Sequence, residues 1–174
     1  MWNIFHNLLR TIHKMPLKSR DEIEPEKITS SKTQIVLRCP FTNCNARIIA
    51  YSSAIPSFNI ENAPNCVYIE SFQFDKTNPK LSSSTISFYR ISDVWDFDNI
   101  GVSKPSEILA EPIIVGSQVH EEEHEKIDVE RLLICSECDR GPLGFAGIVS
   151  GGDKDHRNLK YFLSQDSVLY DVES

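Results

Sequence analysis

The chain has 174 residues, of which 40% are hydrophobic, and this is enough for one domain with its own core. Its formal net charge is −7. Because nucleic-acid binding rests on Lys and Arg side chains that neutralise phosphates, this charge argues against a nucleic-acid partner. No apolar segment approaches the roughly 18 residues that a membrane-spanning helix needs, so we expect a soluble, cytoplasmic protein.

Residues 1–20 contain no acid, and their basic and apolar side chains recur at helical spacing. The basic residues are Arg10, Lys14, Lys18 and Arg20, and the apolar ones include Trp2, Phe5, Leu8, Leu9 and Ile12. Four interpretations fit: an amphipathic surface helix, a mitochondrial presequence, a poorly ordered extension, or residues upstream of a working start at Met15. Residues 16–33 are polar and contain two prolines, which predicts a linker. We therefore divide the chain into an extension, 1–33, and a domain, 34–174.

From residue 34 onward the sequence consists of short runs rich in β-branched and aromatic residues, with turn residues between them. The predicted strands are 34–38, 46–50, 67–74, 85–91, 94–97, 131–134, 145–149 and 158–163. Two polar segments, 75–84 and 116–126, are predicted to be solvated loops. This pattern indicates a single sheet-dominated domain.

Four of the five cysteines form two close pairs, and each pair follows a predicted strand. Cys39 and Cys44 lie in the sequence CPFTNC, and Cys135 and Cys138 lie in CSEC, which Gly141, Pro142 and Gly144 follow. Cysteine pairs at such turns are typical of metal knuckles, and two knuckles together make a four-thiolate zinc site. The alternative is a set of ordinary buried or free thiols.

A four-thiolate zinc ion has no open coordination position for water or substrate, so we expect the ion to be structural. It would close the long loop between Cys44 and Cys135 and hold the two ends of the domain together. The entropic cost of loop closure grows only slowly with length, so one ion can organise the whole fold.

A second informative stretch, ISDVWDFDNIGVSKP, runs from Ile91 to Pro105. If it is a strand, alternation places Trp95 and Phe97 on one face and the acids Asp96 and Asp98 on the other. A half-buried strand explains this pattern. So does a protein-binding edge in which aromatic residues anchor and carboxylates select a basic or metal-phosphate-binding partner.

The motifs CPFTNC, VWDFDNIGVSK and CSECDRGPLGF occur in this order and together resemble the small zinc-containing dissociation stimulators of Rab GTPases, the "suppressor of sec" proteins. The likeness covers about residues 38–163 and is closest to the fungal branch. It implies a mainly β, tent-like arrangement of antiparallel sheets clamped by one zinc ion. It also implies a monomeric, non-enzymatic protein that binds exocytic Rab GTPases, promotes loss of GDP and holds the nucleotide-free form, reaching membranes only through the Rab.

Carried over residue by residue, the resemblance places the zinc ligands at Cys39, Cys44, Cys135 and Cys138. It assigns the acidic Rab contact to Glu137 and the contact with the switch and nucleotide-binding region to Asp93, Val94, Trp95, Asp96, Phe97, Asp98, Asn99, Ile100, Gly101 and Val102. Mammalian members of the family have a two-residue gap in the first knuckle and an aliphatic residue at the position of Asp96, and both features differ here.

The expected mechanism is competition with nucleotide phosphates. The phosphate site of a Rab is built from backbone amides, a lysine and Mg²⁺, all of which attract anions. Asp96, Asp98 and Glu137 would dock near that site, with Trp95 and Phe97 at its rim.

Two rival functions remain open. One is a zinc-containing methionine sulfoxide reductase or another enzyme on the same scaffold, for which Cys66 is the available thiol. Cys66 has no His, Arg or Lys nearby in sequence to lower its pKa. The other is a zinc-ribbon module that binds nucleic acid or ubiquitin-pathway proteins instead of a Rab.

Overall fold

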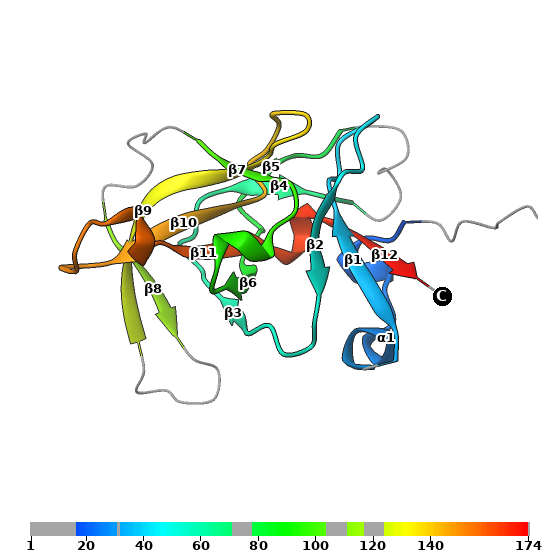
Figure 1. Ribbon diagram of the computed structural model, residues 1–174, viewed down its shortest axis with the longest axis horizontal. Coiled ribbons are helices and arrows are strands. Elements are labelled where there is room, and N and C mark those ends of the chain that lie inside the picture. The colour runs from blue at the N-terminus through cyan, green and yellow to red at the C-terminus, as the bar shows by residue number, and fades with distance from the viewer. Residues whose placement is uncertain (1–16, 31, 71–77, 104–110, 117–123, 174) are drawn as a thin grey trace, which may run out of the picture.

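The computed structural model describes residues 17–30, 32–70, 78–103, 111–116 and 124–173 (Figure 1). β-Strands are the main secondary structure of this part of the chain, and the pairs that they form are antiparallel. The predicted mainly β, antiparallel fold is therefore confirmed.

The strands form three sheets. The three-stranded sheet has the order β12-β1-β2 and contains β1 (Gln34–Arg38), β2 (Arg47–Tyr51) and β12 (Leu169–Glu173). The seven-stranded sheet has the order β3-β6-β11-β10-β9-β7, and β8 also pairs with β9. Its strands are β3 (Ser57–Asn59), β6 (Ser87–Ile91), β7 (Ile100–Val102), β8 (Ile113–Gly116), β9 (His124–Cys135), β10 (Gly144–Val149) and β11 (Lys160–Ser164). The third sheet pairs β4 (Cys66–Tyr68) with β5 (Lys80–Ser82).

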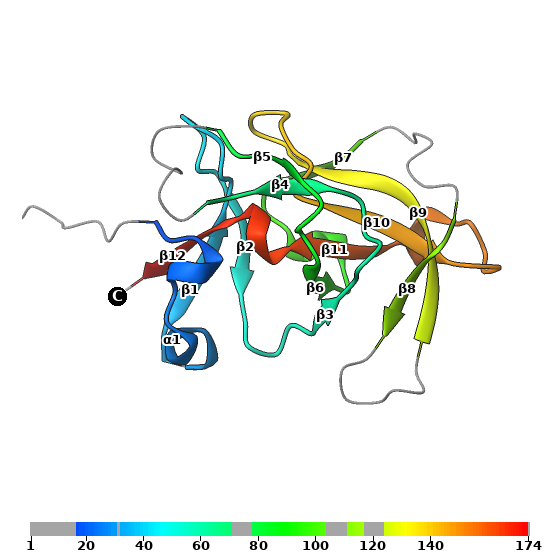
Figure 2. The ribbon, with the colours of Figure 1, turned by 180° about the vertical axis from the view of Figure 1, so that it is seen from behind.

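One hydrophobic core joins the three-stranded sheet to the seven-stranded sheet. Leu37 of β1 and Tyr170 of β12 are fully buried in the same cluster as Leu133 of β9 and Leu163 of β11. Figures 1 and 2 show the three-stranded sheet at one end of the molecule and the large sheet reaching to the other. Apolar burial between the two sheets therefore fixes how they pack on each other.

A second core lies on the large sheet and is aromatic. The rings of Phe145 and Phe162 stack with centroids 4.9 Å apart, and Phe88 meets Phe145 edge-on at 5.2 Å. These three residues come from adjacent segments of the sheet, β10, β11 and β6. Offset and edge-to-face ring pairs stabilise a core beyond their buried area alone.

Gly144, in the GPLGF sequence, allows β10 to approach β11 closely. A Cβ atom added at this position would lie 2.1 Å from the carbonyl oxygen of Phe162, so no larger residue fits without a backbone shift. The neighbouring Leu143 donates to the carbonyl of Leu133 at 2.8 Å and accepts from the Ser164 N–H at 2.9 Å. The chain that leaves the second cysteine pair is thereby held tightly in the sheet.

The expectation of a linker over residues 16–33 is wrong for residues 17–30. This part contains a 3-10 turn, η1 (Arg20–Glu22), and a short helix, α1 (Pro25–Thr29), and Lys18 pairs with Tyr170 of β12. Ile23 and Ile28 are buried in the first core, and each such side chain contributes about 1.5–3 kcal/mol before the cost of ordering. Residues 1–16 of the predicted amphipathic segment, 1–20, lie outside the described residues, and the division at residue 33 stays a prediction.

Several other strand expectations need correction. The predicted strand 67–74 is reduced to β4 in its described part, and residues 71–77 are not described. The predicted loops are partly strand, since 75–84 contains β5 and 116–126 contains the end of β8 and the start of β9. The strand predicted at 131–134 belongs to the much longer β9. No helix among the described residues has the length and hydrophobicity to cross a bilayer.

The 3-10 turn η4 (Gln165–Ser167) lies against the N-terminal segment and carries an acid in an unfavourable position. The pKa of Asp166 is raised to about 6, mainly by burial and also by the nearby Asp21 carboxylate, while Arg20 opposes the shift. A raised pKa means that the folded protein favours the neutral carboxyl group, so ionised Asp166 destabilises the fold.

We expect Asp166→Asn to stabilise the protein at pH 7.5 by about 1 kcal/mol, a value discounted for the partial exposure of the side chain. The advantage should shrink as the pH falls from about 6 toward 4. In this range Asp166 of the folded wild-type protein takes up a proton and no longer carries a buried charge. Urea unfolding at several pH values measures this, with Asp153→Asn as the control for loss of an exposed carboxylate. An advantage that is equal at pH 4 and pH 7.5 would contradict the prediction.

Candidate metal centre and partner-binding surface

Each cysteine pair lies in a knuckle, a tight turn at the end of a strand. In the first knuckle, Cys39 directly follows β1 and its N–H donates to the Ala46 carbonyl at 2.8 Å, while the Cys44 N–H donates to Phe41 at 3.1 Å. Asn43 and Asn45 have φ values of 64° and 52°, a left-handed conformation that asparagine tolerates. The CPFTNCN sequence is therefore suited to this turn.

The second knuckle begins at Cys135, the last residue of β9. Its N–H donates to the Arg140 carbonyl at 2.9 Å, and the Asp139 N–H donates back to the Cys135 carbonyl at 2.9 Å. Asp139 has a φ of 55°, again in the left-handed region. The turn places Cys138 beside Cys135 and leaves Glu137 between them, exposed to solvent.

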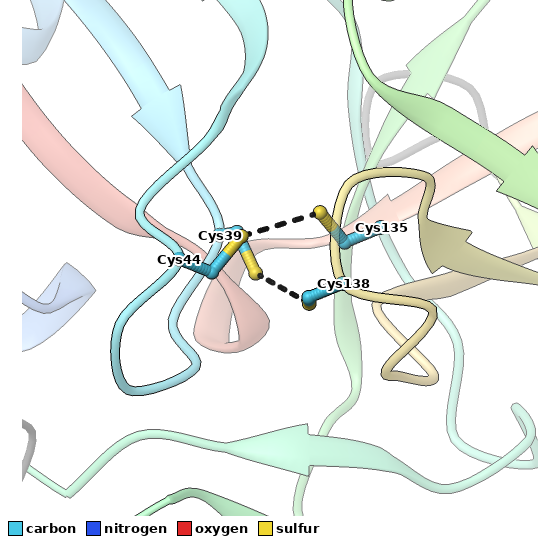
Figure 3. Close-up of side chains that lie close together, drawn as sticks. All are labelled: Cys39, Cys44, Cys135 and Cys138. Carbon is cyan, nitrogen blue, oxygen red and sulfur yellow. Dashed lines mark hydrogen bonds between the residues drawn. The ribbon is translucent and has the colours of Figure 1, made fainter.

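The two knuckles face each other and bring all four sulfurs together, as predicted (Figure 3). The Sγ atoms of Cys39 and Cys138 are 3.7 Å apart, those of Cys44 and Cys135 are 3.8 Å apart, and the four sulfurs lie within 4.8 Å of one another. Sulfurs placed tetrahedrally at about 2.3 Å from a zinc ion would be about 3.8 Å apart. A disulfide needs about 2.05 Å, so the geometry fits a tetrahedral metal ion and not sulfur–sulfur bonds.

Burial at this site opposes thiolate formation in the absence of a cation. It raises the pKa of the Cys39 thiol strongly and raises that of Cys135 as well. Burial acts in the same direction on Cys138, but hydrogen bonds from the side chain and backbone of Arg140 lower the pKa of this thiol overall. A divalent ion would supply the missing positive charge, and four sulfur donors would leave it no open position.

Cys66 lies apart from this group. It is fully buried, its N–H donates to Thr85 Oγ1 at 3.1 Å, and its thiol donates to the Pro64 carbonyl at 3.5 Å. Burial raises its pKa to about 12, although the hydrogen bond with Thr85 works against the shift. A reactive cysteine needs access and a lowered pKa, so this geometry argues against the enzyme alternative.

The strand predicted at 94–97 is instead a 3-10 turn, η2 (Val94–Asp96). The side chain of Asp93 caps it by accepting from the Trp95 N–H at 3.0 Å. Because a 3-10 turn repeats every three residues, Val94 and Phe97 share one side, and both pack on the first core. The ring of Phe97 meets that of Tyr161 edge-on at 6.1 Å.

Strand alternation predicts that Trp95 and Phe97 share a face. In the structure they lie on different faces. The side chain of Trp95 is 86% exposed and is the most exposed of the large hydrophobic residues that the structure describes. The neighbouring Asp93 and Asp96 are exposed as well. A tryptophan left in water without cover is unusual in a monomer and points to a contact surface.

The rest of this segment lies against the second knuckle and β2. Asn99 accepts from the Ser136 N–H at 3.2 Å, and the following strand, β7, pairs Ile100 with Cys135. On the other side, the Asp98 carboxylate forms an ion pair with Arg47 at 2.7 Å. The structure therefore places Glu137, one residue after Ser136, beside the segment 93–102.

Sequence reasoning missed several residues of this region. It missed Ile49, Ile55 and Ile91, which belong to the apolar lining of a 380 Å³ pocket that has the predicted residue Asp96 on its wall. Arg47 was missed as the partner of Asp98, and Arg140 as a contact of Cys138. The position of Arg140, two residues after a ligand in a turn, was a usable signal, whereas the pocket depends on segments far apart in the chain.

The family model described as Mss4 protein matches residues 32–170. Protein DSS4 of Saccharomyces cerevisiae is 32% identical over 137 residues, which cover 75% of this chain and 92% of the yeast protein. No solved structure matches significantly. The family model covers most of this chain, and the alignment with the yeast relative covers nearly the full length of the yeast protein. The resemblance drawn from the motifs is therefore confirmed, and the chain belongs to the Mss4 family.

Proposed function

We propose that the protein binds a Rab-type GTPase, promotes release of its GDP and holds the nucleotide-free form until GTP binds. Membership of the Mss4 family supports a role in GTPase regulation. The observation that carries the proposal is the position of exposed Trp95 and its flanking acids beside the second knuckle. This surface, residues 93–102 with Glu137, is called the contact ridge below.

The contact ridge has the features of an interface centre. Trp95 offers a large apolar side chain, and tryptophans are frequent among the residues that dominate binding energy. The pocket at Asp96, lined by Ile49, Ile55 and Ile91, can receive an apolar side chain of the partner. Capping by Asp93 and the hydrogen bond from Ser136 to Asn99 hold the ridge in place before binding, which reduces the entropy lost on association.

The acids of the ridge supply the effect on nucleotide. Asp96 and Glu137 are exposed and can approach the backbone amides, lysine and Mg²⁺ site that bind phosphates in a GTPase. Asp98 is paired with Arg47, so it presents less free charge and helps to fix the ridge on β2. Carboxylates in the phosphate site compete with GDP, so binding of this protein and binding of GDP weaken each other. The two effects are equal: GDP affinity falls by the same factor by which this protein prefers the empty GTPase over the GDP-bound one. No covalent step is required.

The metal ion that we assign to the four cysteines is Zn²⁺. Four thiolates at tetrahedral spacing suit zinc, and the closed donor set gives the ion a structural role. It holds the first knuckle, which leads into β2, against the second knuckle, which carries Glu137. The ion therefore supports both borders of the contact ridge.

The protein acts as a cytoplasmic monomer on exocytic Rab proteins and reaches the membrane through them.

The first test is release of labelled GDP from a panel of purified Rab GTPases. We expect wild-type protein to accelerate release from at least one Rab, and Trp95→Ala to bind the nucleotide-free Rab about thirtyfold more weakly, a loss of about 2 kcal/mol. The thermal stability of this variant should equal that of wild type, because Trp95 is exposed. Ile114→Ala is the matched control, since Ile114 is 56% exposed but lies on β8 at the other end of β9. Equal loss in both variants would overturn the role of Trp95.

Charge reversal tests the acids. Glu137→Lys and Asp96→Lys should each reduce the GDP-release rate at least tenfold, because a lysine repels the cationic phosphate site of the GTPase. The zinc content and the fold should be unchanged, since both side chains are exposed. Asp153→Lys, a reversal outside the contact ridge, should release GDP at the wild-type rate. Normal release by the Glu137 and Asp96 variants would discard the electrostatic mechanism.

Removal of the metal tests its structural role. A loss of about 5 kcal/mol on chelation would lower the Tm by about 10–20 °C for a chain of this size. We expect this shift for wild-type protein treated with a chelator and for Cys135→Ser. Cys66→Ser, a change of the one cysteine outside the cluster, should still contain one equivalent of zinc by elemental analysis. An unchanged Tm after complete removal of the metal would contradict the structural assignment.

A further inference from the structure

Arg140 connects the two knuckles without using the metal. Its side chain starts in the second knuckle and reaches the first, where its Nη2 donates to the Thr42 carbonyl at 2.9 Å. The guanidinium also lies over the ring of Phe41, 4.7 Å from the ring centroid. Thr42 and Phe41 lie between the two ligands Cys39 and Cys44, so these contacts hold the turn that carries half of the donor set.

Asn78 joins the same set of contacts from a third segment, just before β5. Its Oδ1 accepts from the Thr42 N–H at 2.8 Å and from Arg140 Nη1 at 3.5 Å. Arg140 and Asn78 therefore satisfy both backbone groups of Thr42. A turn whose peptide groups are bound by side chains on two other segments cannot move away easily when the metal leaves.

Charge gives Arg140 a second role. Four thiolates around a divalent ion carry a net charge of −2, and Glu137 and Asp139 add two carboxylates to the same turn. Arg140 is the basic residue of this turn, and its side chain donates a hydrogen bond to Cys138. Residues that hydrogen-bond to metal ligands typically affect metal affinity by about 10–100-fold.

We propose that Arg140 is a positioning residue of the metal centre, which locks the first knuckle onto the second and slows loss of the ion through its contacts with Thr42, Asn78 and Cys138. The inference rests on the zinc site assigned above but is independent of GTPase binding. Without the metal, the same contacts keep the four sulfurs close enough for a new ion to bind.

The test is the rate at which zinc passes from the folded protein to a chromogenic chelator. We expect Arg140→Met to release zinc about tenfold faster than wild type, and Asn78→Ala to fall between the two because Arg140 still reaches Thr42. Arg140→Lys should recover only part of the effect, since lysine keeps the charge but lacks the fork that reaches several acceptors. Arg157→Met is the matched control, because this arginine pairs with Asp155 in an exposed turn.

A spectroscopic measurement separates the hydrogen bond to sulfur from a general loss of stability. In cobalt-substituted protein, the sulfur-to-metal charge-transfer band should move to longer wavelength in Arg140→Met, because a sulfur that has lost a donor gives up electrons more easily. The band should stay in place in Arg157→Met. Zinc release within twofold of wild type, together with an unshifted band, would overturn the proposal. Wild-type protein without bound metal would overturn it together with the zinc assignment, whatever its effect on GDP release.

Discussion

The structure depends on the meeting of two turns that are far apart in the chain. Residues 39–44 and 135–138 lie close together, and their four sulfurs, all within 4.8 Å of one another, are spaced so that they could hold one metal ion. Apolar packing alone brings the sheets together, as buried Leu37 and Leu133 show, but it does not by itself bring four thiols to tetrahedral spacing. Arg140 and Asn78 reinforce the same junction with hydrogen bonds. The cysteine cluster, these hydrogen bonds and the apolar core therefore all lie at the junction of the two turns.

The contact ridge takes its shape from that junction. It is held on one side by the pairing of β7 with β9 and on the other by the Arg47–Asp98 ion pair on β2. Phe97 anchors it in the core, and Trp95 projects outward. The ridge is therefore a rigid surface between two knuckles and not a free loop. A rigid ridge suits the proposed role of holding a nucleotide-free GTPase, because little of the binding energy is needed to order the ridge itself.

The cysteine cluster could be predicted from the sequence because its signals are local. Two cysteine pairs with Asn, Asp and Gly at the turns identify knuckles wherever the intervening chain goes. The strands at 34–38 and 145–149 were predicted correctly because their apolar runs are uninterrupted. The family resemblance came from the same short motifs, and the comparisons confirm it.

Features that depend on tertiary contacts could not be predicted in this way. The sequence VWDF fits strand alternation, but the segment forms a 3-10 turn whose Val94 and Phe97 pack on the first core, which separates Trp95 from Phe97. Ile23 and Ile28 are isolated apolar residues in a polar stretch, so their burial depends on a surface that the rest of the chain provides.

Exposure of Trp95 has an optical consequence. Its indole emits from water in the free protein, so a blue shift of intrinsic fluorescence can report the moment at which another molecule covers it, without any attached dye.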